Sequence, residues 1–247
     1  MIFISFFAVL IGWIIQGLIG LGSGIISTAI LLFFFEAKTV VVSLSLLALV
    51  GTVYLSISNY RGNLFLKDIF VLAVFSFLGA GIGSYLLKVA NQKIVEEVFG
   101  LVIIFTGLYD LFLKNKNIKF PKSLKIPFGA LTGFLGGTVS GLIGGAGPLY
   151  AFYLNQYFHS KEDFKFVISF IFVILNVERI VFYLSYPDLI EFFSSEIIIP
   201  GLLATVLGAY LGNMFTKGLS TDSFKKLVSL SITLFGVYFL IKGLSLP

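Results

Sequence analysis

The sequence predicts an all-α polytopic membrane protein built as two repeats. Of its 247 residues 58% are hydrophobic and 12% are charged, whereas a soluble domain carries about 25% charged residues. Several apolar runs exceed the roughly 18 residues that indicate a membrane-spanning helix. These runs lack the polar face that a soluble helix of the same length would show. A glycine-rich motif then recurs half a chain later, which predicts the duplication.

The first predicted segment, residues 2–35, contains no Asp, Glu, Lys or Arg and has GLIGLGSG at 17–24 in its middle. A helix that simply crosses a bilayer needs about 20 apolar residues, and four central glycines would weaken it. We therefore expect this segment to be interrupted there. The sequence GLIGGAGP at 141–148 repeats GLIG 124 residues later, and GSYL at 83–86 and TGLY at 106–109 have counterparts at 208–211 and 235–238.

The duplication predicts about eight hydrophobic segments. Residues 1–113 form the first transmembrane repeat, with segments at 2–35, 39–58, 68–88 and 95–113. Residues 128–247 form the second, with segments at 126–158, 166–186, 197–215 and 226–244. Between the repeats, KNKNIKFPKSLKIP at 114–127 contains five lysines and two prolines, which predicts a cytoplasmic linker rather than a helix interior.

The distribution of cations decides the predicted topology. If each glycine-interrupted segment crosses once, the 16 cations other than Arg179, which lie in loops or near span ends, divide evenly between the two sides of the membrane. If each such segment enters and leaves on the same side, 12 of these 16 lie on the side of the linker. Cytoplasmic loops carry the excess of Lys and Arg. The sequence therefore predicts two inverted repeats, each a glycine-broken helical hairpin followed by three transmembrane helices.

The two predicted hairpin tips form a candidate substrate site. Non-helical backbone at membrane depth is tolerated only where protein or a polar cavity satisfies it, and half-helix N-termini carry partial positive charge. Paired interrupted segments in matching halves indicate a transporter's binding site. Close helix packing through GxxxG motifs is the structural alternative. The residues of the two tips are Gly20, Gly22, Ser23 and Gly24 in the first, and Gly144, Gly145, Gly147 and Pro148 in the second.

Ionisable residues inside a membrane are functional candidates, and ILNVERIVFY at 174–183 places three polar residues in one span. Asn176 and Arg179 share a helix face, so Arg179 is predicted to donate to an anion with Asn176 beside it. A structural ion pair with a neighbouring helix is the equal alternative. Glu178 points about 100° away from Arg179 and is a candidate for proton coupling, or for pairing with a neighbouring helix.

Gln16 and Ser140 occupy equivalent positions before the two glycine clusters. Their side chains are expected to donate to a bound anion, to satisfy the broken helix ends, or to do both. Thr52 falls opposite Asn176 when the two halves are superimposed on their GLIG motifs.

Composition excludes several functional classes. The chain has no Cys and one His, His159, so thiolate metal sites and an H-E-x-x-H zinc site are excluded. We expect no metal and no cofactor. No G-x-x-x-x-G-K-[ST] motif is present, which argues against ATP hydrolysis by the chain. The net charge of +5 is expected to face anionic lipid head groups, not nucleic acid.

The glycine clusters, together with SGLIGGAGPLYAFYL at 140–154 and the lysine-rich linker, resemble the TauE/SafE (sulfite exporter-like) membrane transporters over essentially the full chain. The sequence differs at Ser23, within the usual glycine triplet, and at Ala29, where proline is common. The resemblance implies secondary transport, with export as the expected direction, of sulfur-containing anions such as sulfite, thiosulfate or organosulfonates.

We therefore predict a multi-pass protein of the cell membrane that carries a small anion by alternating access, coupled to a proton or uncoupled. An anion channel of the same architecture is the alternative. An intramembrane enzyme is the weakest reading, because the chain offers no nucleophile with a partner His at membrane depth.

Overall fold

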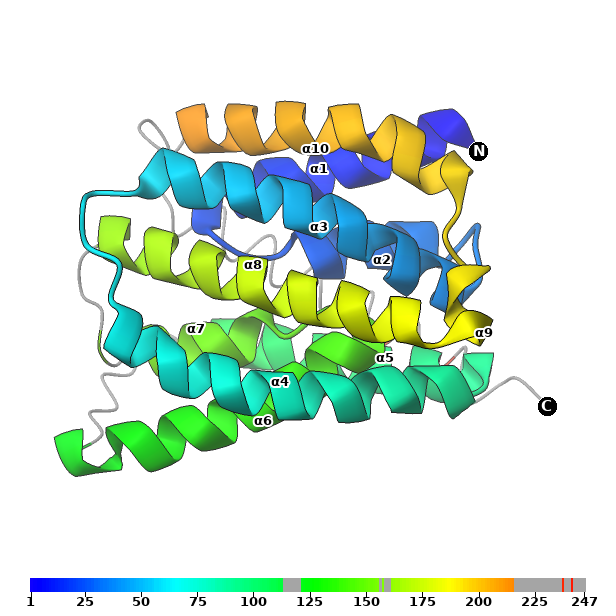
Figure 1. The fold of residues 1–247 in the computed structure, drawn as a ribbon. Coiled ribbons are helices and arrows are strands. Elements are labelled where there is room, and N and C mark those ends of the chain that lie inside the picture. The colour runs from blue at the N-terminus through cyan, green and yellow to red at the C-terminus, as the bar shows by residue number, and fades with distance from the viewer. Residues whose placement is uncertain (113–120, 156, 158–160, 216–236, 238–240, 242–247) are drawn as a thin grey trace.

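In the computed structural model the described residues are 1–112, 121–155, 157, 161–215, 237 and 241. Within this part of the chain the regular structure is entirely helical, and six helices are long and apolar enough to span a membrane (Figure 1). The elements are α1 (Ile2–Ile19), α2 (Ser23–Leu31), α3 (Ala37–Asn59), α4 (Leu66–Val89), α5 (Gln92–Phe112), η1 (Lys122–Leu124), α6 (Lys125–Ile143), α7 (Gly147–Asn155), α8 (Lys161–Ser185), α9 (Pro187–Ile190) and α10 (Ser195–Phe215).

The first glycine-rich segment forms an antiparallel pair of helices, α1 and α2. The hydroxyl of Ser27 in α2 donates to the carbonyl oxygen of Ala8 in α1 over 3.2 Å. The chain reverses at Gly20 and Gly22, whose φ angles are +87° and +116°. Side chains other than glycine rarely adopt this left-handed region. The predicted interruption of this segment is confirmed.

The second glycine-rich segment forms the equivalent pair, α6 and α7. The Tyr153 hydroxyl in α7 donates to the carbonyl oxygen of Lys125 at the start of α6 over 3.2 Å. Nearer the turn, the Tyr150 hydroxyl donates to the carbonyl oxygen of Gly133 over 3.3 Å. Gly144 ends α6 with a φ of +75°. Both interrupted segments are therefore hairpins with a glycine at the end of their first helix.

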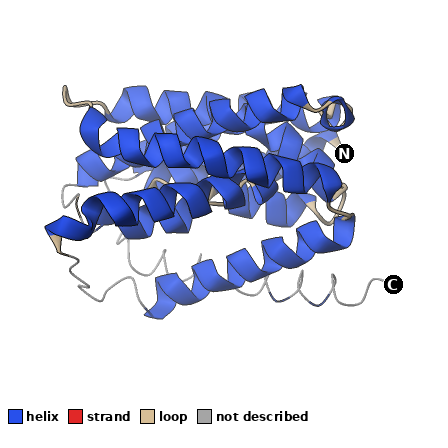
Figure 2. Cartoon of the chain, turned by 60° about the horizontal axis from the view of Figure 1, so that its bottom comes forward, coloured by secondary structure: helices blue, strands red, loops and turns tan. Residues whose placement is uncertain are grey.

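The helices lie roughly along one direction, so the bundle has two ends (Figures 1 and 2). We call the end that carries Pro121–Lys125 the linker end; there the Tyr60 and Phe166 rings meet at 5.3 Å, joining the end of α3 to the start of α8. We call the opposite end the far end. There the Lys38 ammonium donates to the carbonyl oxygen of Lys88 at 3.0 Å, and the Lys88 ammonium pairs with Asp188 at 3.2 Å.

The first helix of each hairpin packs along a helix from the other half of the chain, since α1 lies against α10 and α6 lies against α4. Glycines allow these backbones to approach closely. A Cβ built on Gly17 of α1 would lie 2.8 Å from the backbone of Ala209 and Asn213 in α10. Helices α3 and α8 pack against each other and cross the middle of the bundle in Figure 1.

The ordinary spans predicted at 39–58, 68–88, 166–186 and 197–215 correspond to α3, α4, α8 and α10, and the segment at 95–113 to α5. The span predicted at 226–244 lies outside the described residues apart from positions 237 and 241, as does most of the linker. One helix start differs from expectation. Helix α8 begins at Lys161 and includes Lys165, which we had expected in a loop.

Candidate functional site

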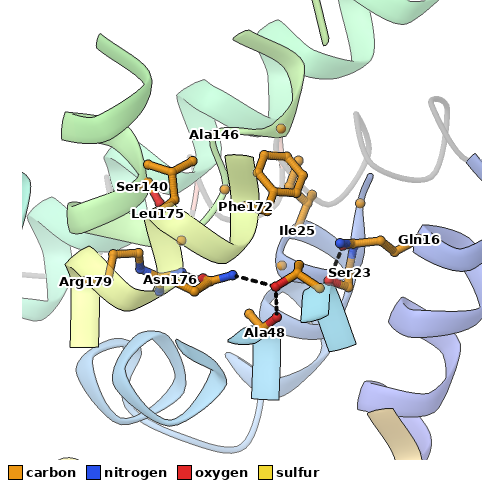
Figure 3. Close-up of a pocket in the computed structure, with 16 residues that line it drawn as sticks. Gln16, Ser23, Ile25, Ala48, Ser140, Ala146, Phe172, Leu175, Asn176 and Arg179 are labelled. Atoms are coloured by element: carbon orange, nitrogen blue, oxygen red, sulfur yellow. Dashed lines mark hydrogen bonds between the residues drawn. The ribbon is translucent and has the colours of Figure 1, made fainter. Parts of the chain in front are cut away.

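The tips of the two hairpins meet in the interior of the bundle, and a pocket lies between them (Figure 3). The contact is close: a Cβ on Gly24 would lie 2.7 Å from the carbonyl oxygen of Gly144. The pocket is open to solvent, and its empty volume is about 460 Å³ when the space at its opening is included. It is lined by Gln16, Gly22, Ser23, Gly24, Ile25, Ala48, Thr52, Ser140, Gly144, Gly145, Ala146, Gly147, Phe172, Leu175, Asn176 and Arg179.

Ten of the twelve residues that the sequence suggested for a substrate site line this pocket. The other two do not line it: Gly20 lies in the first turn, and Pro148 is the second residue of α7. The structure adds an apolar wall that includes Phe172 and Leu175 of α8. These two share a helix face with Asn176 and Arg179. The helical spacing of the four positions could therefore have identified Phe172 and Leu175 from the sequence.

Among the described residues, Arg179 is the only cationic side chain in the pocket wall, and it is 3% exposed. Its Nη1 donates to Oδ1 of Asn176 at 3.1 Å, and its Nη2 donates to the carbonyl oxygen of Val41 at 3.2 Å. Its Nε donates to the Tyr183 hydroxyl at 3.4 Å. A guanidinium has five N–H groups, so two of them have no protein acceptor among these contacts and remain for a ligand.

The alternative reading of Arg179 as half of an ion pair required a carboxylate on a neighbouring helix. Among the described residues, none lies within 4.0 Å of its guanidinium. The neighbouring Tyr183 ring lies 5.6 Å from the guanidinium carbon, and the Tyr183 hydroxyl donates to the carbonyl oxygen of Gly141 at 2.6 Å. Tyr183, which sequence reasoning missed, therefore links Arg179 to the end of α6.

The turn of the first hairpin is closed by its own side chains. Oε1 of Gln16 accepts from the backbone N–H of Ser23 at 3.0 Å and from the Ser23 hydroxyl. The N–H of the first residue of a helix lacks a partner within the helix, so Gln16 caps the N-terminus of α2. Of the two roles expected for Gln16, the structure shows the local one.

The turn of the second hairpin lacks this closure. In the described part of the chain, the Ser140 side chain makes no hydrogen bond, and the backbone N–H groups of Gly145, Ala146 and Gly147 have no acceptor. Gly147 begins α7 and Pro148 follows it, in a position where the missing N–H of proline costs little. Helix N-termini attract anions through such N–H groups and the helix dipole.

Asn176 connects α8 to α3 in the pocket wall. Its Nδ2 donates to Oγ1 of Thr52 at 3.4 Å, which is long for a hydrogen bond. The Thr52 hydroxyl also donates to the carbonyl oxygen of Ala48 at 2.6 Å, one turn earlier in α3. Figure 3 shows these two hydrogen bonds as dashed lines that run from Asn176 to Ala48 through one side chain, near Gln16 and Ser23. Thr52 and Asn176, which are equivalent positions in the sequence, therefore contact each other directly.

Glu178 lies away from this pocket, as its position beside Arg179 on a helix requires. Its side chain is 7% exposed, and Oε2 has no hydrogen-bond partner among the described residues. The described residues contain no group of three His, Cys, Asp or Glu side chains that could hold a metal ion.

The site therefore combines a buried guanidinium with two half-helix N-termini, which together can bind an anion of a few heavy atoms. Comparison with known proteins agrees with this chemistry, because residues 4–239 match the model of the family described as Sulfite exporter TauE/SafE. The chain belongs to the TauE/SafE family. No curated protein and no solved structure gives a significant match. Membership of this family, with six membrane-capable helices among the described residues, makes the chain a multi-pass membrane transporter of the sulfite-exporter type.

Proposed function

We propose that the chain is a secondary transporter that exports sulfite or a related small sulfur-containing anion, such as thiosulfate or an organosulfonate, across the cell membrane. The observation that carries this proposal is the pocket between the hairpin tips, where the N-termini of α2 and α7 and the guanidinium of Arg179 converge. A sulfite or sulfonate group offers three oxygen acceptors to these donors. The phenyl ring of Phe172 and the side chain of Leu175 leave room for a small organic group.

We further propose that residues 1–113 and 128–247 are inverted repeats, with the linker end in the cytoplasm, and that transport proceeds by alternating access. The pairing of elements supports this idea. Helix α1 packs on α10 as α6 packs on α4, and α10 contacts α3 as α4 contacts α8, which is the pattern expected when two equivalent halves exchange their contacts. The described lysines of η1 and of the starts of α6 and α8 lie at the linker end, which supports a cytoplasmic location for this end by the positive-inside rule.

Glu178 is our candidate for the coupled proton. A carboxylate buried at membrane depth with an unpaired oxygen is costly when ionised, which favours its protonated form. A conformation that exposes Glu178 to water would then release the proton. The replacement Glu178→Gln is expected to abolish anion accumulation driven by a proton gradient while anion exchange at equal pH continues. Accumulation that survives Glu178→Gln would remove the proton-coupling role.

Counterflow in proteoliposomes tests the transport proposal. Vesicles loaded with sulfite, thiosulfate, sulfoacetate, taurine or sulfate are mixed with a labelled anion, and saturable exchange is expected for a sulfur-containing anion. The replacement Arg179→Gln should raise the half-saturating concentration at least about tenfold, since hydrogen bonds to a charged group contribute about 1.5–3 kcal/mol. Arg61→Gln is the matched control, because Arg61 is the other arginine of the chain and is exposed in the α3–α4 loop.

Each other outcome of this experiment has a definite meaning. Exchange that Arg179→Gln leaves unchanged would keep the carrier and remove Arg179 from the site. Anion flux without counterflow or saturation would favour a channel of the same architecture. No flux of any anion on the panel would contradict the proposed substrate class.

A further inference from the structure

A second buried cation lies on the same face of α8 as Arg179. Lys165 is 5% exposed, and its ammonium donates to the carbonyl oxygen of Gly17 at 3.0 Å and to Oδ1 of Asn213 at 3.2 Å. Residues seven and fourteen apart nearly align on a helix. Lys165, Phe172 and Arg179 therefore form one stripe along α8, and the last two line the pocket.

Lys165 occupies the side of the pocket that faces the linker end. At 1.5 Å per residue, it lies about 10 Å along α8 from Phe172 and about 21 Å from Arg179. Its two acceptors belong to different elements, since Gly17 is near the end of α1 and Asn213 is near the end of α10. One side chain therefore joins three helices beside the turn of the first hairpin, between the pocket and this end of the bundle.

We propose that Lys165 is the gate of the anion pathway at the linker end, an inference that rests on the transport proposed above. In the closed arrangement its ammonium holds the end of α1 and the end of α10 against α8. When the first hairpin moves away from α8, these two contacts break and the ammonium faces the opened route. An anion that moves between the pocket and the linker end then takes the place of the Gly17 and Asn213 oxygens as the partner of the Lys165 ammonium.

The far end provides a comparison. Lys38 also donates to a backbone carbonyl at the end of a helix, that of Lys88 in α4, at 3.0 Å. However, Lys38 is on α3 at the far end and does not contact either hairpin turn through this bond. Both lysines stabilise the C-terminal end of a helix by charge, so Lys38 controls for the loss of a helix cap at a site away from the pocket.

Cysteine accessibility tests this proposal without knowledge of the substrate. The chain has no natural cysteine, so Ala48→Cys in the pocket wall serves as a single reporter for a membrane-impermeant methanethiosulfonate reagent. Added at the linker end, the reagent should label the reporter about tenfold faster when Lys165→Met is also present, because a charge-assisted hydrogen bond no longer favours the closed state. Lys38→Met in the same background should leave the rate unchanged.

Two further variants keep the test decisive. Asn213→Leu removes one acceptor of the gate and is expected to give a smaller increase, so it replaces Lys165→Met if that variant does not fold. Lys165→Arg retains a cation and should return the rate to within about twofold of the parent.

The overturning result is an equal labelling rate in the parent, in Lys165→Met and in Asn213→Leu, which would leave Lys165 as a helix cap and would not touch the transport proposal. No labelling of the reporter from either end in any variant, although it reacts after denaturation, would contradict the aqueous pocket. That result would overturn the proposed function together with the gate.

Discussion

The two hairpin turns begin with the same four residues, GLIG, yet they are completed in different ways. The first turn has two glycines in the left-handed region, Gly20 and Gly22, whereas the second has only Gly144. The position equivalent to Gly22 is Ala146, and the position equivalent to Ser23 is Gly147. In the first turn Gln16 caps α2 through Ser23; in the second no side chain of the described residues takes this place.

The side chains that α8 places beside the two turns also differ. Gly17 and Gly141 are equivalent by the repeat, and α8 supplies a donor to the carbonyl of each, from Lys165 and from Tyr183. At the second turn, however, the guanidinium of Arg179 also lies directly against Gly144. In the described part of the chain, the first N–H of α2 is therefore already paired by Gln16, whereas the N–H groups of Gly145, Ala146 and Gly147 at the second turn have no acceptor. We expect changes at the first turn to affect stability and changes at the second to affect anion binding.

The largest difference is expected between Gly144→Ala and Gly20→Ala. Both place a side chain in the left-handed region, which costs about 1–2 kcal/mol. A Cβ on Gly144 would also lie 2.9 Å from Nη2 of Arg179, whereas the nearest atom to a Cβ on Gly20 is 3.5 Å away. Gly144→Ala should therefore raise the half-saturating anion concentration at least about tenfold. Gly20→Ala should lower the thermal stability and leave the half-saturating concentration unchanged. Equal losses of affinity in the two variants would contradict the proposed difference between the turns.

Tyr183→Phe should have the next largest effect. It keeps the buried ring but leaves the carbonyl oxygen of Gly141 without its donor, and a buried unpaired acceptor costs about 1–3 kcal/mol. We expect lower thermal stability in detergent together with weaker anion binding, because the Nε contact of Arg179 is lost as well. Tyr85→Phe, at an exposed position of α4, is the control and should change neither quantity.

The equivalent positions Gln16 and Ser140 sharpen the contrast at a smaller scale. Gln16→Met removes the cap of α2 and should cost about 1 kcal/mol of stability, measured by thermal unfolding. Ser140→Ala removes a hydroxyl that makes no hydrogen bond in the described part of the chain, so it should leave stability unchanged. A larger loss from Ser140→Ala than from Gln16→Met would show that the two turns had been assigned the wrong way round.

The smallest effect is expected for Thr52→Val. The hydroxyl of Thr52 donates within its own helix, and its contact with Asn176 is long. Hydrogen bonds between membrane helices average about 0.6 kcal/mol, and this one should be at or below that value in a thermal unfolding measurement. A loss of anion binding in Thr52→Val, with stability unchanged, would instead place Thr52 in direct contact with the anion.

Sequence reasoning reached much of the site because its signals are local. A glycine cluster inside an apolar run predicts a turn at Gly20 or Gly144 without knowledge of any neighbour. The spacing of Asn176 and Arg179 fixes their common face. The predicted segments at 126–158 and 166–186 leave Lys165 between them, whereas the structure places it inside α8. Its partners, Gly17 and Asn213, are distant in sequence, and no local pattern pairs them with it.

The sequence by itself determined the membrane class, the spans in the described part of the chain, the two interruptions and most of the residues around the pocket, because hydrophobicity and backbone preference act over a few neighbouring residues. Only the tertiary structure decided that the two turns touch, that Arg179 meets Gly144 and Val41 rather than a carboxylate of the described chain, and that Gln16 closes one turn while Ser140 leaves the other open. These outcomes depend on distances between helices far apart in the chain, which packing alone sets.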